Sequence, residues 1–387
     1  MSIEDILSDA RSVVKKVVPD HVEITQVDFE GPTIVIYTKN MEAFAESNEL
    51  VRQIAQQLRR RIIVRPDPSL LATQEEAEKV IRELIPVEAQ ITGIYFETET
   101  GEVSIEALSP GMVIGRHGQL LNEIKKKIGW APKVVRTPPI PSKTVEEIRQ
   151  YLRTINDERQ SFLKQVGRKL AREIPSGENY VRITALGGFR QVGRSCALLS
   201  TKESKVLIDC GVLISEDNGS PYLNAPEVMP LSSIDAVVIT HAHLDHSGLV
   251  PALYKYGYEG PIYTTPPTRD LMSLLQLDFI KVAMGEARKS PYESQHVRKA
   301  VANTIPLKYG ETTDIAPDVR LTFQNAGHIL GSALAHFHIG DGLYNIAMSG
   351  DIKFEKTWLF NPAVNKFPRL ETLVLESTYG GYHDVQP

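Results

Sequence analysis

The chain has 387 residues, of which 42% are apolar, 24% are charged and two are cysteine, with a formal net charge of −5. This length accommodates two or three domains with buried cores, whereas the cysteine count excludes a disulfide framework and the charge excludes a globally basic nucleic-acid-binding protein. No apolar run is long enough for a signal peptide or a membrane span, so we expect a soluble, cytoplasmic protein with no membrane partner.

The amino-terminal third contains a weak internal repeat. Two apolar β-type runs, at 58–68 and 129–139, each end in an arginine and prolines. A helix-like segment precedes each run, and two short alternating strands around a turn precede each helix. The shared order of helix, strand, strand, helix, strand predicts two copies of one small α/β module, at 1–70 and 71–140.

The second module contains the sequence GRHG immediately before a predicted helix. Its glycines allow a backbone loop to approach a phosphate chain, while the arginine and the helix amino terminus supply positive potential. The loop resembles the GxxG loop of a KH domain, which clamps single-stranded nucleotides; the first module has NMEAF at 40–44 instead and lacks this clamp. The predicted contacts with single-stranded RNA are the loop and two lysines of the following helix: Gly115, Arg116, His117, Gly118, Lys125 and Lys126.

A stiff break, PPIPS at 138–142, separates these modules from a polar helical segment at 143–172. The segment lacks a wide apolar stripe, so we expect 141–177 to be a helical connector on the surface. From residue 178 to 387, short β-type runs alternate with helices, which predicts a further α/β domain. Asp209, His241, Asp351 and Glu376 come just after such runs. The carboxyl ends of strands form the edge of an α/β sheet where binding and catalytic sites lie.

The sequence THAHLDHSG at 240–248 places three histidines and an aspartate within six residues at the end of a predicted strand. Imidazole and carboxylate are the ligands that zinc prefers where thiolates are absent. A further histidine lies between glycines in GHILGSA, and a further aspartate follows a strand in SGDIK. Six donors are too many for one open catalytic zinc, so we predict two ions roughly 3.5–4 Å apart. The predicted ligands are His241, His243, Asp245, His246, His328 and Asp351.

Histidine clusters also have simpler interpretations that require no metal ion. A chance surface cluster would account for the histidines at 241–246 alone, but not for the ordered companions at 328 and 351. His336 and His338 repeat the spacing of two metal ligands, yet they lie inside a predicted strand without nearby acids. We therefore assign this second pair to packing or to the solvent-facing side of the strand.

The order of Asp209, HAHLDHSG, GHILGSA and SGDIK resembles the metallo-β-lactamase superfamily, and GGFRQVGRSC, HSGLVP and ESTYGG resemble its beta-CASP nucleases. These motifs and the paired modules together make the chain similar to the amino-terminal portion of archaeal KH-containing homologues of the cleavage and polyadenylation specificity factor endonuclease. The resemblance implies an α/β fold of two KH-type modules followed by a metallo-β-lactamase αββα sandwich that is incomplete here, because the beta-CASP lobe is absent.

The resemblance also implies a role for each position. One zinc would be held by His241, His243 and His328, and a second by Asp245 and His246, with Asp351 bridging the two ions. Asp209 would orient ligands, Asp245 would orient the attacking water, and Glu376 would assist protonation of the leaving group. These last three are the predicted catalytic residues.

The function implied by the resemblance is that of a zinc-dependent RNA endonuclease, with 5′→3′ exonuclease action as a further activity, in RNA 3′-end processing and transcription termination. The partners implied are RNA and the transcription machinery, and longer relatives would form homodimers. Two alternatives to the nuclease stay open. In such nucleases a lobe with two further histidines follows ESTYGG, so the first alternative is an RNA-binding fragment with an incomplete catalytic half. The second alternative is a small-molecule metallo-hydrolase, which shares the zinc motif.

Overall fold

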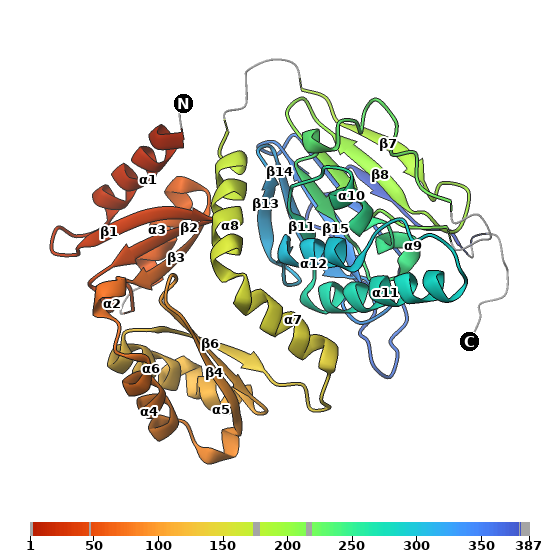
Figure 1. The fold of residues 1–387 in the computed structure, drawn as a ribbon. Helices are drawn as coiled ribbons and strands as arrows, with labels where there is room; N and C mark the ends of the chain where they lie inside the picture. Colours follow the sequence, from red (N-terminus) through yellow and green to blue (C-terminus); the bar gives the residue numbers. More distant parts are fainter. Residues whose placement is uncertain (1–2, 46–47, 173–178, 214–218, 379, 381–387) are drawn as a thin grey trace. The chain divides into compact units, whose positions relative to one another are not determined.

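The computed structural model describes residues 3–45, 48–172, 179–213, 219–378 and 380. The chain divides into two compact units, Met1–Arg168 and Lys169–Pro387, and the division falls within the predicted connector. Both units mix helices and strands, which confirms the α/β class (Figure 1). Within the described residues, no helix is both long and apolar enough to cross a bilayer.

The first unit contains the predicted repeat. Its first copy consists of α1 (Ile3–Val17), β1 (Ile24–Glu30), β2 (Thr33–Thr38), α2 (Met41–Ala45), α3 (Asn48–Leu58) and β3 (Arg61–Pro66). The second consists of α4 (Gln74–Leu84), β4 (Ile91–Glu97), β5 (Glu102–Ala107), α5 (Pro110–Ile114), α6 (Gln119–Ile128) and β6 (Ala131–Arg136). In each copy the middle strand pairs antiparallel with the first strand and parallel with the last. The element order predicted from the repeat is therefore confirmed.

Alternation along the strands builds the core of the second copy. In β5 every second residue is buried, which turns Val103 and Ile105 towards Ile81 of α4 and Ile124 of α6 in one apolar cluster. A capping box fixes the start of α4, because the side chain of Thr73 accepts a hydrogen bond from the backbone N–H of Glu76 and the Glu76 carboxylate accepts one in return. Local capping and alternating burial thus define this module.

Polar contacts hold the two copies together. The guanidinium group of Arg65 in β3 lies 2.5 Å from a carboxylate oxygen of Glu30 in the first copy and 2.5 Å from one of Glu102 in the second. Only 3% of the Arg65 side chain is exposed. A buried arginine that pairs with one partly buried acid from each copy fixes the register of one copy on the other.

The polar segment at 143–172, predicted to be a helical connector on the surface, is helical, and most of its residues are at least partly exposed. It forms two helices, α7 (Lys143–Thr154) and α8 (Asn156–Leu170), that meet at Ile155. In α7, Arg153 lies 3.3 Å from the Glu106 carboxylate and stacks 3.8 Å from the centre of the Tyr95 ring. In α8, Gly167 lies so close to Phe29 that an added Cβ would come within 2.4 Å of the phenylalanine Cβ. Each helix therefore contacts one module through an arginine or a glycine, and each also buries apolar side chains, Ile148 in α7 and Leu163, Val166 and Leu170 in α8.

The second unit contains two sheets (Figure 1). The first has the order β12-β11-β10-β9-β8-β7, with β7 (Arg182–Gly187), β8 (Cys196–Ser200), β9 (Lys205–Ile208), β10 (Ala236–Val238), β11 (Ile262–Thr264) and β12 (Thr304–Pro306). The second has the order β13-β14-β15-β16-β17, with β13 (Thr312–Ala316), β14 (Val319–Asn325), β15 (Ala333–Ile339), β16 (Tyr344–Met348) and β17 (Thr372–Val374). Strands β9 to β12 run parallel, so their carboxyl ends share one edge.

Helices cover the first sheet of this unit. They are α9 (Leu244–Ser247), α10 (Val250–Lys255), α11 (Pro266–Gly285) and α12 (Ser294–Ala302). Leu253 of α10, Met272 of α11 and Val297 of α12 share one buried cluster with Leu207 and Val237 of the sheet. Parallel strands that are buried on both faces are apolar throughout, as the sequence runs here are.

The second histidine pair lies in β15, as expected, and contributes to packing. His336 is 2% exposed, and its ring centre lies 4.2 Å from that of His338. The Nδ1 of His338 lies 2.8 Å from the side-chain oxygen of Asn345, and its Nε2 lies 2.9 Å from the Thr322 hydroxyl. Both ring nitrogens of His338 are therefore occupied by neighbours in the sheet.

Candidate metal centre and nucleic-acid loop

Strand ends bring the predicted ligands together. His241 and His243 follow β10, Asp351 follows β16, and His328 lies on the loop between β14 and β15. These four residues offer ligand atoms that all lie within 4.8 Å of one another. The Nε2 of His328 lies 3.2 Å from the Nδ1 of His243 and 3.5 Å from the Oδ2 of Asp351. These four residues, here named the first group, therefore offer four ligand atoms around one point.

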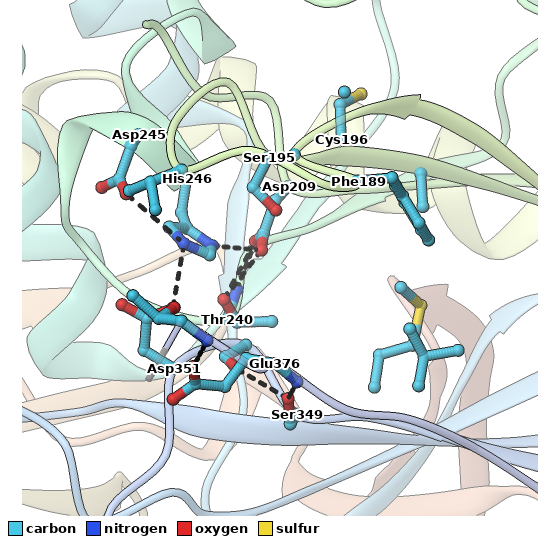
Figure 2. A pocket seen from close by; sticks show the side chains of 18 of the residues that line it. Phe189, Ser195, Cys196, Asp209, Thr240, Asp245, His246, Ser349, Asp351 and Glu376 are labelled. Carbon is cyan, nitrogen blue, oxygen red and sulfur yellow. Dashed lines mark hydrogen bonds and ion pairs between the residues drawn. The ribbon is translucent and has the colours of Figure 1, made fainter. Parts of the chain in front are cut away.

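A second group consists of Asp245, His246 and Asp351, which Figure 2 shows close together. The Nε2 of His246 lies 3.2 Å from the Oδ1 of Asp351 and 3.8 Å from the Oδ2 of Asp245. The other carboxylate oxygen of Asp351, Oδ2, lies 3.7 Å from the Nε2 of His241 in the first group. One aspartate thus presents one oxygen to each group, which is the arrangement of a carboxylate between two cations.

The first group has the chemistry of a metal site. Among the described residues, the Nε2 of His241 is buried without a hydrogen-bond partner, which is costly unless something else occupies its lone pair. Burial, followed by the neighbouring charge of His246, holds the pKa of His241 well below its usual value, so the ring is neutral. Burial also lowers the pKa of His328. Neutral imidazoles beside a carboxylate are the donor set that suits zinc.

The Asp351 carboxylate is held in its charged form. Burial opposes its ionisation, but the hydrogen bond and the charge of His246, together with His241 and His328, outweigh burial and hold the pKa of Asp351 well below its usual value. The carboxylate is therefore available as an anionic donor across the neutral pH range.

Asp209 fixes the orientation of the second group. It follows β9 at a φ of 56°, a left-handed conformation that aspartate tolerates better than most residues. Its Oδ2 lies 2.7 Å from the Nδ1 of His246, and its Oδ1 accepts a hydrogen bond from the backbone N–H of Thr240 at 2.8 Å. Because Nδ1 of His246 is engaged by the carboxylate, Nε2 faces Asp245 and Asp351.

The charge of Asp209 also changes the titration of its partner. Burial disfavours the His246 imidazolium, but Asp209 and Asp351 outweigh burial and raise the pKa of His246 to about 10. A cation that binds at Nε2 must therefore displace a proton. The pair resembles the carboxylate–histidine pairs that support metal ligands.

Glu376 lies beside Asp351 in the wall of a cavity of about 470 Å³ (Figure 2). Its carboxylate accepts hydrogen bonds from the backbone N–H groups of Ile352 at 3.4 Å and Thr378 at 3.0 Å. Its own N–H donates to the Ser349 hydroxyl at 2.9 Å. The structure thus brings Glu376 to the second group, next to Asp351.

Three features of this site were not singled out from the sequence. Thr240 and Ser349 position Asp209 and Glu376 through hydrogen bonds that join distant segments. Gly211 leaves room for the turn that carries Asp245, since an added Cβ would lie 1.6 Å from the Asp245 carbonyl oxygen. The glycine after LIDC was the available signal for this close approach.

The predicted RNA-binding loop lies in the first unit, at the junction of α5 and α6. Gly115 and Gly118 have φ values of 73° and 76°, which favour glycine, and His117 adopts a φ of 52°. Arg116 and His117 are exposed. The loop therefore presents a cationic and an aromatic side chain ahead of the amino terminus of α6.

The lysines of α6 differ in accessibility. Lys126 is exposed, whereas Lys125 is half-buried, and burial lowers the pKa of Lys125. Lys127 pairs with Glu123 one turn earlier, at 3.2 Å. In the first module the corresponding place follows α2, and residues 46–47 there lie outside the described residues.

Comparison with known proteins gives two family matches. The model for the KH domain of transcription termination factor FttA matches residues 4–71. The model for the metallo-β-lactamase superfamily domain matches residues 198–361. The first match falls on the module without the glycine loop. The second spans all four segments that carry the candidate ligands and Asp209, at 209, 241–246, 328 and 351.

Three relatives that match over the whole chain carry the same name. Transcription termination factor FttA of Methanosarcina mazei is 58% identical over 388 residues, 100% of this chain and 61% of the relative. Those of Methanothermobacter thermautotrophicus and of Lokiarchaeum sp. are 52% and 43% identical, each over 100% of this chain and 61% of the relative. The chain thus spans about three fifths of the length of these curated relatives.

Proposed function

We propose that this chain, which belongs to the metallo-β-lactamase superfamily and carries a KH domain, binds single-stranded RNA and cleaves its phosphodiester bonds with the help of metal ions. The observation that carries the proposal is the position of Asp351 between two donor groups, with one oxygen 3.2 Å from His246 and the other 3.7 Å from His241. Two cations a few ångströms apart are the usual device for phosphodiester hydrolysis.

The proposed cofactors are two zinc ions. The first group, His241, His243 and His328, would hold one ion, and Asp245 with His246 would hold the other, with Asp351 shared. When bound, the ions supply Lewis acidity that activates water and stabilises negative charge on the phosphoryl oxygens.

The side chains around the ions have separate tasks. Asp209 keeps the His246 ring in the orientation that points Nε2 at the site. Asp245, 3.8 Å from that nitrogen, can accept a hydrogen bond from the attacking water and align it with the phosphorus. Glu376 is fixed in the cavity wall by two backbone N–H groups, and its proposed task is to assist protonation of the leaving oxygen.

RNA as the substrate is supported by the first unit and by the relatives. The loop at 115–118 combines left-handed glycines, an exposed arginine and a helix amino terminus, which suits a phosphate chain. The relatives are named transcription termination factors, so we place the activity in transcription termination and the linked 3′-end formation of RNA. Both internal cleavage and 5′→3′ degradation belong to this proposal.

A second candidate function has its own observation. The second donor group has three members, Asp245, His246 and Asp351, whereas the first has four. If the second ion requires a further ligand, the chain is an RNA-binding fragment that does not cleave. A small-molecule hydrolase is disfavoured, because a KH domain has no task in such an enzyme.

Cleavage and binding are separated by two substitutions. We expect Asp245→Ala to abolish zinc-dependent cleavage of a 5′-labelled single-stranded RNA while its affinity for RNA stays within about two-fold of the parent. Gly118→Asp should weaken binding at least roughly ten-fold, because it adds a negative charge and a Cβ at a left-handed position. Gel analysis of cleavage and anisotropy of labelled RNA provide the two readouts. Cleavage at the parent rate by Asp245→Ala would refute the catalytic assignment. If neither the parent nor Asp245→Ala cleaves the RNA, the hypothesis of an RNA-binding fragment is favoured.

A further inference from the structure

The segment that follows Asp351 presents large apolar side chains to solvent beside the metal centre. In residues 353–363, all of them described and here named the aromatic loop, Phe354 is 54% exposed, Leu359 is 84% exposed and Trp358 is fully exposed. Indole is among the costliest side chains to leave in water, so an indole with no packing contact calls for an explanation.

The base of the aromatic loop is anchored to the segment that carries His328. The N–H of Lys353 donates to the carbonyl oxygen of Ala326 at 2.9 Å, and the N–H of Ala363 donates to that of Lys353 at 2.8 Å. The Asn325 side chain donates to the carbonyl oxygens of residues 361 and 362, both at 3.0 Å. The loop thus begins and ends at the residues that precede His328.

The tip of the aromatic loop is also ordered. The hydroxyl oxygen of Thr357 accepts hydrogen bonds from the N–H groups of Leu359 at 3.3 Å and Phe360 at 2.9 Å. This turn excludes Trp358 from the interior of the loop and presents it outwards. In Figure 1 this segment is drawn in blue as a loop that projects from the second unit.

The loop is close enough to the metal centre to contact the same RNA strand. It starts two residues after Asp351, and Trp358 lies five positions after Lys353. An arm of that length spans at most roughly 18 Å. At the base, an added Cβ on Gly327, the neighbour of His328, would lie 2.4 Å from the Lys353 carbonyl oxygen.

Charge favours a nucleic acid as the occupant. Exposed Lys353 and Lys356 alternate with the exposed rings of Phe354 and Trp358 in the sequence KFEKTWLF, and with one exposed acid, Glu355, the stretch keeps a net positive charge. Ammonium groups that contact phosphates and rings that stack on bases are the combination used for single-stranded nucleic acids. An apolar protein partner would gain from the rings but would have to desolvate the lysines.

We propose that the aromatic loop is a base-stacking platform that holds single-stranded RNA beside the metal centre, with Trp358 stacked on a base and Lys353 and Lys356 against the phosphates. This inference deepens the proposed function and rests on it for the identity of the substrate. It adds a second RNA-binding element, on the catalytic unit itself, to the loop at 115–118.

The two tryptophans of the chain allow a direct test. Trp130 is 2% exposed and bonded through its indole to Ala72, so quenching by added RNA reports on Trp358. Oligouridylate is titrated into the parent and into Gly118→Asp, whose KH loop is disabled, while anisotropy of labelled RNA measures binding. We expect RNA to quench the fluorescence of both proteins, and Trp358→Ala to abolish the quenching. In the Gly118→Asp background, Trp358→Ala should weaken binding about five-fold or more, and Trp358→Phe less.

Several outcomes would overturn the platform. They are RNA binding without quenching, equal affinity in the presence and absence of Trp358, and loss of all measurable binding in Gly118→Asp. An emission change that depends on protein concentration and not on RNA would identify the loop as an interface between copies instead. None of these readouts requires cleavage, so a chain that binds RNA at Trp358 but does not cut it counts against the catalytic proposal alone.

Discussion

At the scale of single residues, the site depends on side chains that act by orienting other side chains and not by contacting a substrate. Asp209 is 3% exposed and reaches the metal centre only through His246 and Thr240. Its role depends on its charge and its position after β9, because a neutral amide of the same shape would accept the hydrogen bond of the ring more weakly and could turn its NH2 group towards the ring instead. Asp209 is therefore a positioning residue.

Asp209→Asn tests this role. The amide keeps the volume of the side chain but leaves the His246 ring free to adopt the other tautomer or to rotate. We expect zinc affinity at the weaker site to fall about 10- to 100-fold, with the stronger site little changed. Competition with a chromogenic chelator measures both constants. Asp341→Asn, on a side chain that is 77% exposed, is the matched control and should change neither. Parent-like affinities for Asp209→Asn would leave it without the proposed role.

At the scale of elements, α7 and α8 make contacts that could not be predicted from the sequence. The repeat at 1–140 was predictable, because helix and strand periods recur in the same order in both copies. The contacts of Arg153 with Tyr95 and of Gly167 with Phe29 were not, because they leave no periodic pattern in the sequence, unlike the buried apolar residues of α8 at 163, 166 and 170. The sequence marks these two helices as polar, and only the structure shows what their polar and small residues contact.

A pair of glycine substitutions tests the packing of α8. In a helix, Gly→Ala usually stabilises by about 1 kcal/mol. At Gly111 of α5 nothing lies within 4 Å of an added Cβ, so Gly111→Ala should be neutral or stabilising. At Gly167 the methyl group would lie 2.4 Å from Phe29, so Gly167→Ala should destabilise the first unit by about 1–3 kcal/mol. Urea unfolding measures both variants, and equal effects at the two positions would show that α8 does not pack closely there.

At the scale of the whole molecule, the metal ligands were identified from the sequence more readily than the way they are arranged. The cluster HAHLDH and the strand ends before residues 328 and 351 sufficed to predict a metal site. The division of the donors into two groups around Asp351 was suggested by their positions at the strand ends and by resemblance, but spacing along the chain does not specify which oxygen faces which histidine. The order of the aromatic loop had no signal in the sequence, since its anchors at 325–326 are distant in the chain.

The central claim, that Asp351 lies between two zinc ions, is tested most directly by native mass spectrometry of the zinc-reconstituted chain. We predict two zinc ions per chain for the parent and for Asp341→Ala, and loss of at least one ion in Asp351→Ala, because both donor groups share that carboxylate. One ion or none in the parent, or two ions in Asp351→Ala, would contradict the account.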